Sequence, residues 1–246
     1  MWRDRMETSM NALSSDNFDS AKIIPSILTD SQKTFFSDLS TFSELDPQPE
    51  IIQLDVIDGI FAPELTVEPS ILNQDLVVST LDAIQVDLHL MTVDPIDYVH
   101  EVYENQSVRA VIAQIEKIHS LTEFLEEVKA NHLLAGFALD VYTPFESIDQ
   151  AFLPELKVVQ IMGGQAGSQG QTFAPQIIEK IKAAQEAREA LALDYEIYVD
   201  IGMNPTTIPQ AKQAGADGFV VGSYLQKENP QLAWEELNQA LENERE

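Results

Sequence analysis

Cysteine is absent from this 246-residue sequence, and basic residues are scarce. Without cysteine the chain can form neither a disulfide framework nor a thiolate metal site, so a secreted protein held together by disulfides is not expected. Its 14 Lys and Arg residues stand against 41 Asp and Glu residues, which gives a formal net charge of -27. Such an excess of negative charge repels nucleic acids and anionic lipids. We therefore expect a cytoplasmic protein that binds neither nucleic acid nor membrane.

Long apolar runs are missing from the start of the chain, which is polar. Residues 1–21 mix Arg3 and Arg5 with acidic residues and contain no stretch long enough for a signal peptide or a membrane anchor. We interpret them as a flexible extension. With 44% hydrophobic residues, the whole chain is long enough for one large core. We expect residues 22–246 to form a single domain.

Strand-like and helix-like stretches alternate from Lys22 onward. Apolar runs of strand length are expected at about 22–28, 50–56, 84–91, 108–115, 133–140, 156–162, 195–200 and 217–222. The stretches between them carry helix signals, such as the capping box of residues 120–123, the Asn229-Pro230 start and the terminating Gly215. Eight strands alternating with helices predict a parallel sheet closed into a (β/α)8 barrel. An open, doubly wound sheet is the alternative.

Polar side chains occupy the ends of several expected strands. Asp55 and His89 lie within two apolar runs, and Asp200 ends a third. In a barrel the strands point their C-terminal ends at one face, so these side chains should share a pocket with Ser26 and Met91. A buried carboxylate needs a cation, hydrogen-bond donors or a raised pKa, and imidazole with carboxylates is a usual set of metal ligands. Taken singly, each could instead be a capping aspartate or a core histidine.

Glycines gather in the loops after the last three expected strands. They occur within residues 163–170, at Gly202 and at Gly222, which precedes Ser223. Glycine lets backbone amides approach a phosphate closely, and the loops after the seventh and eighth strands often bind phosphate in barrels. No Lys or Arg lies in these loops. We therefore expect a phosphorylated ligand held by backbone amides and by the N-terminus of a helix beginning near Ser223.

The motifs of the chain, taken together, resemble those of the ribulose-phosphate 3-epimerases. They are Ile24–Leu28, Leu54–Gly59 followed by Phe61 and Pro63, Asp87–Met91, Gly170–Phe173, Val199-Asp200, and Ala214–Asp217 running on to Gly222-Ser223. The likeness extends from about Lys22 to Leu241. This family is a (β/α)8 barrel that interconverts D-ribulose 5-phosphate and D-xylulose 5-phosphate in the pentose phosphate pathway. Its members generally use a divalent metal held by two histidines and two aspartates.

The resemblance implies a role for each candidate residue. Asp55 and Asp200 would be the catalytic acid and base and, together with His89, ligands of a divalent cation such as Zn, Mn, Fe, Co or Mg. The residues that it places around the substrate are Ser26, Met91, Met162, Gly167, Gly170, Gly202, Gly222 and Ser223. Two carboxylates on opposite faces of a planar enediolate can remove a proton from C3 on one side and return it on the other.

Two substitutions depart from the family pattern. Gln53 stands where the family has its first metal histidine, and its neutral amide is at best a weak ligand, which disfavours zinc more than manganese or magnesium. Ile201 replaces the glycine that directly follows the catalytic aspartate, so a bulky side chain occupies a phosphate-binding position. We expect a divergent epimerase that is able to form a homo-oligomer. The alternatives are a barrel of the same family that binds a sugar phosphate or a partner without catalysis, and other phosphate-binding barrels such as decarboxylases or hexulose-phosphate enzymes.

Overall fold

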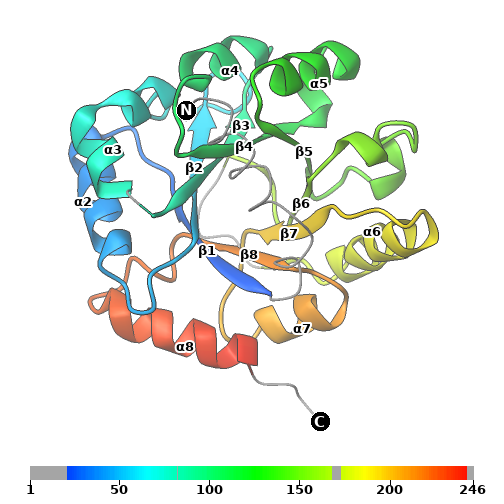
Figure 1. Ribbon diagram of the computed structural model, residues 1–246. Helices are drawn as coiled ribbons and strands as arrows, with labels where there is room; N and C mark the ends of the chain where they lie inside the picture. Colours follow the sequence, from blue (N-terminus) through cyan, green and yellow to red (C-terminus); the bar gives the residue numbers. More distant parts are fainter. Residues whose placement is uncertain (1–20, 82, 168–172, 243–246) are drawn as a thin grey trace, which may run out of the picture.

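The computed structural model describes residues 21–81, 83–167 and 173–242. Within these ranges parallel strands form one closed barrel in chain order, and the last strand pairs with the first (Figure 1). The strands are β1 (Lys22–Ile27), β2 (Ile51–Ile57), β3 (Gln85–Met91), β4 (Val108–Gln114), β5 (Leu134–Leu139), β6 (Val158–Met162), β7 (Glu196–Asp200) and β8 (Gly218–Val221). The (β/α)8 barrel is thus confirmed, and the open sheet is excluded. The extension expected at the N-terminus lies, apart from Ala21, outside the described residues.

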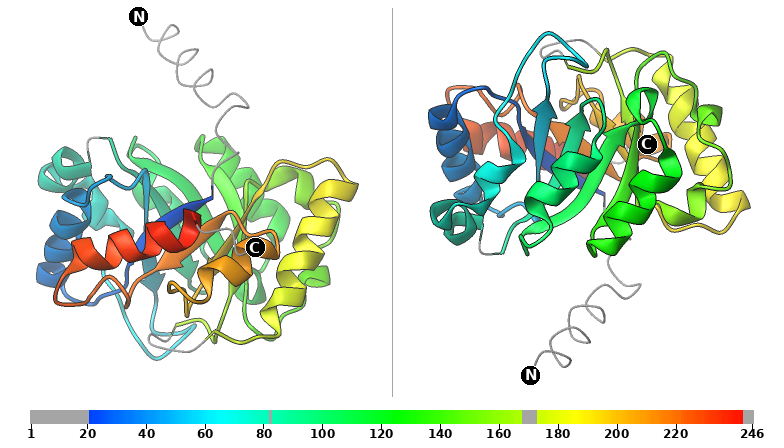
Figure 2. Two further views of the ribbon diagram at one scale, coloured as in Figure 1. Left: turned by 90° about the horizontal axis from the view of Figure 1, so that it is seen from below. Right: turned by 90° about the horizontal axis from the view of Figure 1, so that it is seen from above.

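Helices surround the barrel (Figure 2). They are α2 (Gln32–Ser43), α3 (Asp75–Leu81), α4 (Ile96–Val102), α5 (Leu121–Ala130), α6 (Ile177–Ala190), α7 (Ile208–Gln213) and α8 (Pro230–Glu242). The expected helix signals are present: Ser120 Oγ accepts a hydrogen bond from Glu123 N at 3.2 Å, and Asn229 Oδ1 accepts one from Leu232 N at 3.1 Å. Gly215 follows α7 with a φ of 111°, a left-handed conformation that favours glycine.

The connection between β5 and β6 departs from strict alternation. Residues 140–157 are all described, and they contain two short 3-10 helices, η3 (Phe145–Ser147) and η4 (Leu153–Glu155), in place of an α-helix. Pro144 and Pro154 lie in these turns and have no backbone N–H to donate to a longer helix. Two further 3-10 helices, η1 (Pro69–Asn73) and η2 (Ile115–Lys117), belong to the connections after β2 and β4.

Each strand is buried on both faces, as expected when helices cover the outside of a barrel and side chains fill the inside. All seven residues of β2 are buried. Leu54 and Val56 belong to the apolar core that includes the helices, whereas Ile51 belongs to a separate cluster with Ile24 and Tyr198 from other strands. Strand alternation therefore directs every second side chain of β2, including its polar ones, into the barrel.

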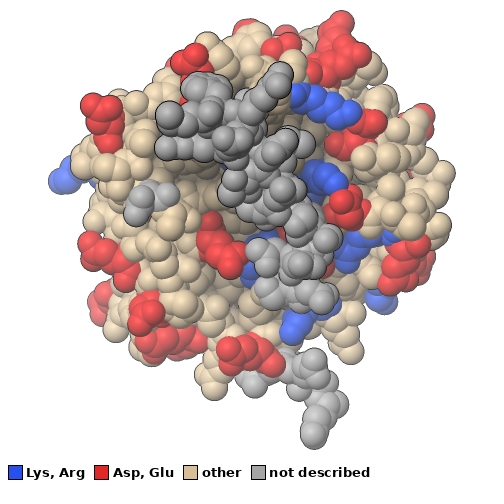
Figure 3. Space-filling model, in the orientation of Figure 1, with Lys and Arg blue, Asp and Glu red and all other residues tan. Residues whose placement is uncertain are grey.

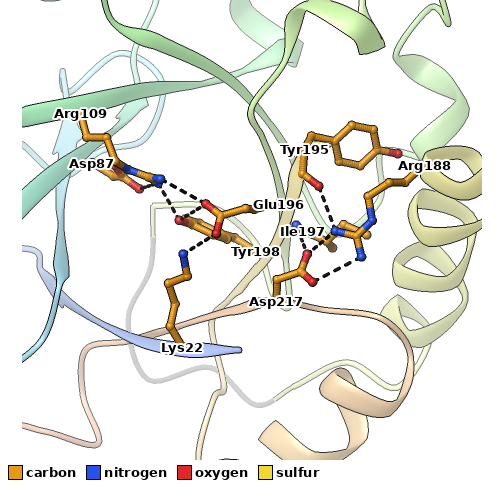
Figure 4. A network of polar contacts seen from close by, with 9 residues as sticks. All are labelled: Lys22, Asp87, Arg109, Arg188, Tyr195, Glu196, Ile197, Tyr198 and Asp217. Atoms are coloured by element: carbon orange, nitrogen blue, oxygen red, sulfur yellow. Dashed lines mark hydrogen bonds and ion pairs between the residues drawn. The ribbon is translucent and has the colours of Figure 1, made fainter. Parts of the chain in front are cut away.

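An ionic layer formed by Lys22, Asp87, Arg109 and Glu196, with the hydroxyl of Tyr198, closes the barrel near the N-terminal ends of the strands (Figure 4). Arg109 Nε and Nη2 donate to the two carboxylate oxygens of Asp87 at 2.9 and 2.6 Å, and its Nη1 donates to Glu196 Oε2 at 3.2 Å. Lys22 Nζ forms an ion pair with Glu196. Burial acts to raise the pKa of Glu196, but the charges of Arg109 and Lys22 outweigh it and lower that pKa.

A second polar group in Figure 4 fastens α6 to the barrel. Arg188 of α6 donates through Nη1 to Tyr195 O at 2.9 Å and pairs with the carboxylate of Asp217. Asp217 also accepts a hydrogen bond from Ile197 N at 2.7 Å. These contacts hold the residues before β7 and β8 against one helix.

Charged side chains of both signs are exposed on the face shown in Figure 3. Asp and Glu lie all around its rim, while Lys and Arg are found mainly in the right half of the view. The acidic residues visible on this face are thus spread around it rather than collected in one patch. Among the described residues, no helix is both long enough and apolar enough to cross a membrane.

Candidate active site

A cavity opens at the C-terminal ends of the strands. It encloses about 560 Å3, part of it open to solvent. The lining includes nine residues singled out in the sequence: Ser26, Asp55, Met91, Met162, Gly167, Asp200, Gly202, Gly222 and Ser223. The barrel therefore brings together strand ends and loops that are far apart in the sequence. Of the remaining candidates, Gln53 and His89 are fully buried, and Gly170 lies outside the described residues.

Three potential metal ligands converge beside this cavity. Asp55 and His89 are paired in the register of β2 and β3, and Asp200 ends β7. His89 Nδ1 lies 2.9 Å from Asp55 Oδ1 and 3.7 Å from Asp200 Oδ2, and one ligand atom of each residue lies within 4.8 Å of the others. This donor set fits a divalent cation. Burial raises the pKa of Asp200 to about 7, and the negative charge of Asp55 adds to the effect.

Three glutamine amides surround His89. Gln53 Nε2 donates to Asp55 Oδ1 at 2.8 Å and lies 3.5 Å from His89 Nδ1. Gln114 Nε2 lies 3.0 Å from His89 Nε2, on the other side of the ring. Gln160 Nε2 lies 3.1 Å from His89 Nδ1 and 3.2 Å from Asp200 Oδ2. The centre is therefore enclosed by amides as well as by acids.

Gln160 was not singled out in the sequence. It is fully buried in β6, whose other residues are Val158, Val159, Ile161 and Met162. A polar residue within so apolar a strand, two positions before Met162, was the available signal, since alternate residues share a face.

The mouth of the cavity has an apolar wall. Met91 and Met162, both expected beside the substrate, are buried in a cluster with Ile57 and Ala166. Ile201 packs against this cluster. Such a wall excludes water from one side of the cavity, which strengthens the electrostatic interactions of the neighbouring carboxylates.

The expected helix beginning near Ser223 is absent from the structure, and that prediction was wrong. The described chain after β8 makes a turn in which Leu225 N donates to Gly222 O at 3.0 Å, and α8 begins only at Pro230. The Asn229-Pro230 signal sets the start of the helix there. An anion beside Gly222 and Ser223 would therefore depend on loop amides and not on a helix N-terminus.

Ile201 adopts a conformation that is unusual for its side chain. Its φ is 72°, and the following Gly202 has a φ of 78°. A β-branched residue in this left-handed region is strained by roughly 1–3 kcal/mol. Ile201 N donates to Asp200 Oδ1 at 2.6 Å, so the strained residue also helps to fix the carboxylate.

Asp58, the second carboxylate of the β2 motif, organises a loop. Its Oδ1 accepts hydrogen bonds from Ile60 N at 2.8 Å and Phe61 N at 2.7 Å, and its Oδ2 accepts one from Val93 N at 2.7 Å. Burial alone would raise the pKa of Asp58, but these amide donors lower it. Of the two aspartates in the motif, Asp55 therefore lies beside the cavity, and Asp58 joins the loops after β2 and β3.

Comparison with known proteins agrees with this geometry. Residues 22–226 match the family described as the ribulose-phosphate 3 epimerase family. The chain is 32% identical over 178 residues to a ribulose-phosphate 3-epimerase of Chlamydia pneumoniae, which covers 72% of this chain and 76% of the relative. It is 28% identical over 203 residues to that of Escherichia coli strain K12, which covers 82% and 88%.

Solved structures share the fold at much lower identity. A structure of KGPDC from Streptococcus mutans in complex with D-R5P superposes with a TM-score of 0.68 at 10% identity, covering 90% of this chain and 97% of that one. A 3-hexulose-6-phosphate synthase gives 0.65 at 16% identity, covering 89% and 99%. These two matches support the barrel alone. The match to the family and the sequence relatives go further: the chain belongs to the ribulose-phosphate 3-epimerase family of isomerases.

Proposed function

We propose that the protein interconverts D-ribulose 5-phosphate and D-xylulose 5-phosphate by moving a proton at C3. The observation that carries this proposal is the pair of buried carboxylates, Asp55 and Asp200, held by different strands at one cavity with His89 beside both. Burying two acids in one place costs free energy, so their presence favours a chemical role over a structural one.

The two aspartates act as acid and base. One carboxylate takes the C3 proton from one face of the ketose, and the other, as a carboxylic acid, gives a proton to the opposite face. The pKa of Asp200, raised by burial to about 7, suits a group that exchanges protons near neutral pH. In the reverse reaction the two residues exchange roles.

A divalent cation fits the same centre, with Asp55, His89 and Asp200 as ligands and Gln53 as a weaker one. Zinc, manganese, iron, cobalt and magnesium are the candidate ions. The bound ion would stabilise the negative charge that develops on the substrate oxygens. Gln53 Nε2 meanwhile donates to Asp55, which fixes the orientation of that carboxylate.

The rest of the cavity would hold the substrate. Ser26 would bind the sugar hydroxyls, and Met91 and Met162 would exclude water from the reacting carbon. The phosphate would be held by backbone amides at Gly167, Gly170, Gly202, Gly222 and Ser223. We also infer that residues 22–246 make up one domain, that residues 1–21 are an extension, and that this protein without cysteine acts in the cytoplasm, in the pentose phosphate pathway. It would bind neither nucleic acid nor membrane, and it would be able to form homo-oligomers.

A second candidate function is the binding of a sugar phosphate without catalysis. Ile201 favours it, since a strained, bulky residue follows Asp200 where the family has glycine. Gln53 favours it too, because an amide replaces a metal-binding histidine. Both candidates predict binding of the ketose phosphate, and only the epimerase predicts exchange at C3.

The test is deuterium wash-in from D2O at C3 of ribulose 5-phosphate, measured with added Mn2+, Zn2+, Mg2+ or Co2+. Asp55→Asn and Asp200→Asn should each lower the exchange rate by a factor on the order of 10²–10⁴, the effect of losing a positioned acid or base. Asp97→Asn makes the same chemical change on the exposed surface of α4 and should leave the rate unchanged. Absence of exchange with every metal would overturn the epimerase proposal. Full activity in either of the first two variants would overturn the two-base mechanism.

A further inference from the structure

The contacts of His89 Nδ1 cannot all be satisfied by the protein alone. Within 3.5 Å of this atom lie a carboxylate oxygen of Asp55 and the amide nitrogens of Gln53 and Gln160. A ring nitrogen carries either a proton or a lone pair. With a proton, it donates to Asp55 but meets two amide donors. With a lone pair, it accepts from an amide but faces the negative oxygen of Asp55.

The same amides leave three buried oxygens without a partner. Among the described residues, no hydrogen-bond donor reaches Oε1 of Gln53, Gln114 or Gln160. The three side chains are at most 1% exposed. A buried carbonyl oxygen that gives up water and gains no donor costs free energy, so each oxygen calls for a donor or a cation.

A cation resolves the conflict at His89 Nδ1 and gives the oxygen of Gln160 a partner if the amide of Gln160 turns over. Rotation about the last side-chain bond exchanges NH2 and carbonyl oxygen, which places Oε1 where Nε2 now lies, next to His89 Nδ1 and Asp200 Oδ2. The lone pair of His89, both carboxylates and this oxygen then all face one positive charge. His89 Nε2 becomes the protonated nitrogen. Gln114 Nε2 lies 3.0 Å from it, so the amide of Gln114 turns over in the same way and accepts a hydrogen bond through its carbonyl oxygen.

We propose that Gln160 is a ligand of the divalent cation and determines which metal the centre selects. This inference rests on the metal centre of the proposed function and adds a residue from β6 to it. Amide and carboxylate oxygens suit Mn2+ and Mg2+, whereas Zn2+ prefers nitrogen and sulfur donors. With one histidine, two carboxylates and the oxygen of Gln160 as ligands, the centre binds Mn2+ in preference to Zn2+ relative to a site built from two histidines and two aspartates.

The experiment measures metal affinity without substrate. Chelator-treated protein is titrated with Mn2+ by electron paramagnetic resonance and with Zn2+ by calorimetry. Gln160→Leu, which fits an apolar strand, should weaken Mn2+ binding by about tenfold or more and change Zn2+ binding much less. Gln160→Glu, which keeps an oxygen ligand, should bind Mn2+ at least as tightly as the parent. Gln106→Leu, the same change at an exposed position, should have no effect.

The outcomes separate this inference from the proposed function. Unchanged Mn2+ affinity in Gln160→Leu, together with weaker binding in Asp55→Asn, would refute the role of Gln160 and leave the three-ligand centre intact. Equal losses of Mn2+ and Zn2+ binding would also refute it, because a general disturbance of the site would not discriminate between ions. A parent protein that binds no divalent ion would overturn both the centre and the inference. If the parent and the variants bind Mn2+ and Zn2+ as expected but the parent shows no exchange at C3, the epimerase proposal is overturned and the role of Gln160 as a ligand is kept.

Discussion

Glu196→Gln should destabilise the barrel from the end opposite the active site. Glu196 is 3% exposed and pairs with Lys22 and Arg109, so the ionic layer holds two cations and two anions when Asp87 is counted. Replacing the carboxylate by a neutral amide of the same shape leaves two cations against one anion. The substitution removes charge without creating a cavity.

The magnitude follows from the burial of these groups. Two unit charges about 3 Å apart attract by roughly 5 kcal/mol at an effective dielectric constant near 20. Removing one partner of a buried pair costs about 3–5 kcal/mol, because the other charge is left uncompensated. The side chain of Lys22 is 19% exposed and can regain some water. We therefore expect the free energy of unfolding to fall by the lower value of this range, about 3 kcal/mol. For a chain of this size that corresponds to a fall in melting temperature of about 6–12 °C.

Urea and thermal unfolding at pH 7 and in acid measure this loss. Asp194→Asn is the matched control, since the Lys157–Asp194 pair is exposed, with 63% of the Asp194 side chain accessible, and should contribute less than about 1 kcal/mol. The folded-state pKa of Glu196 lies below its ordinary value of 4.5. Its contribution is therefore complete above that value and is lost as the pH falls through the lowered pKa, so parent and variant should converge in acid. A difference below about 1 kcal/mol at pH 7, or one that persists unchanged in acid, would refute the reasoning.

Two further predictions concern the cavity. A Cβ at Gly222 would lie 2.9 Å from Ser26 Oγ, so Gly222→Val should raise KM for the ketose phosphate by about tenfold or more, with a smaller effect in Gly222→Ala; steady-state kinetics showing an unchanged KM would contradict it. Gln53→His should supply a nitrogen ligand and tighten Zn2+ or Mn2+ binding roughly tenfold, measured as retained metal by mass spectrometry. Tight metal binding in this variant with no exchange at C3 in either protein would contradict the epimerase assignment.

The strands could be located from sequence because both of their faces are buried. A strand covered on both sides is a nearly continuous apolar run, so the expected run at 84–91 differs by one residue from β3. The helices could be located less accurately from the sequence than the strands. The β5–β6 connection contains Pro144 and Pro154 and forms 3-10 helices in place of an α-helix, and the start expected near Ser223 is displaced to Pro230.

Only part of the candidate site could be predicted from the sequence. Asp55, His89 and Asp200 could be placed together, because a barrel gathers the C-terminal ends of all its strands. Gln160 could not, since its contact with His89 joins residues 71 positions apart and depends on which side chains meet across the interior. Local patterns report which face a residue occupies and leave its partner on that face undetermined.

Closure of the barrel gives the activity a particular dependence on folding. The cavity takes Ser26 from the first strand and Gly222 from the end of the last, and these strands meet at the β1–β8 seam. A fragment ending before β7 would hold Asp55 and His89 but have no Asp200, and an intact chain with its seam open would separate Ser26 from Gly222. A barrel that lacks β7 or the pairing of β1 with β8 would therefore have an incomplete cavity. The proposed activity should thus appear during refolding only after β1 and β8 have paired, and its appearance would report that the two ends of the sheet have joined.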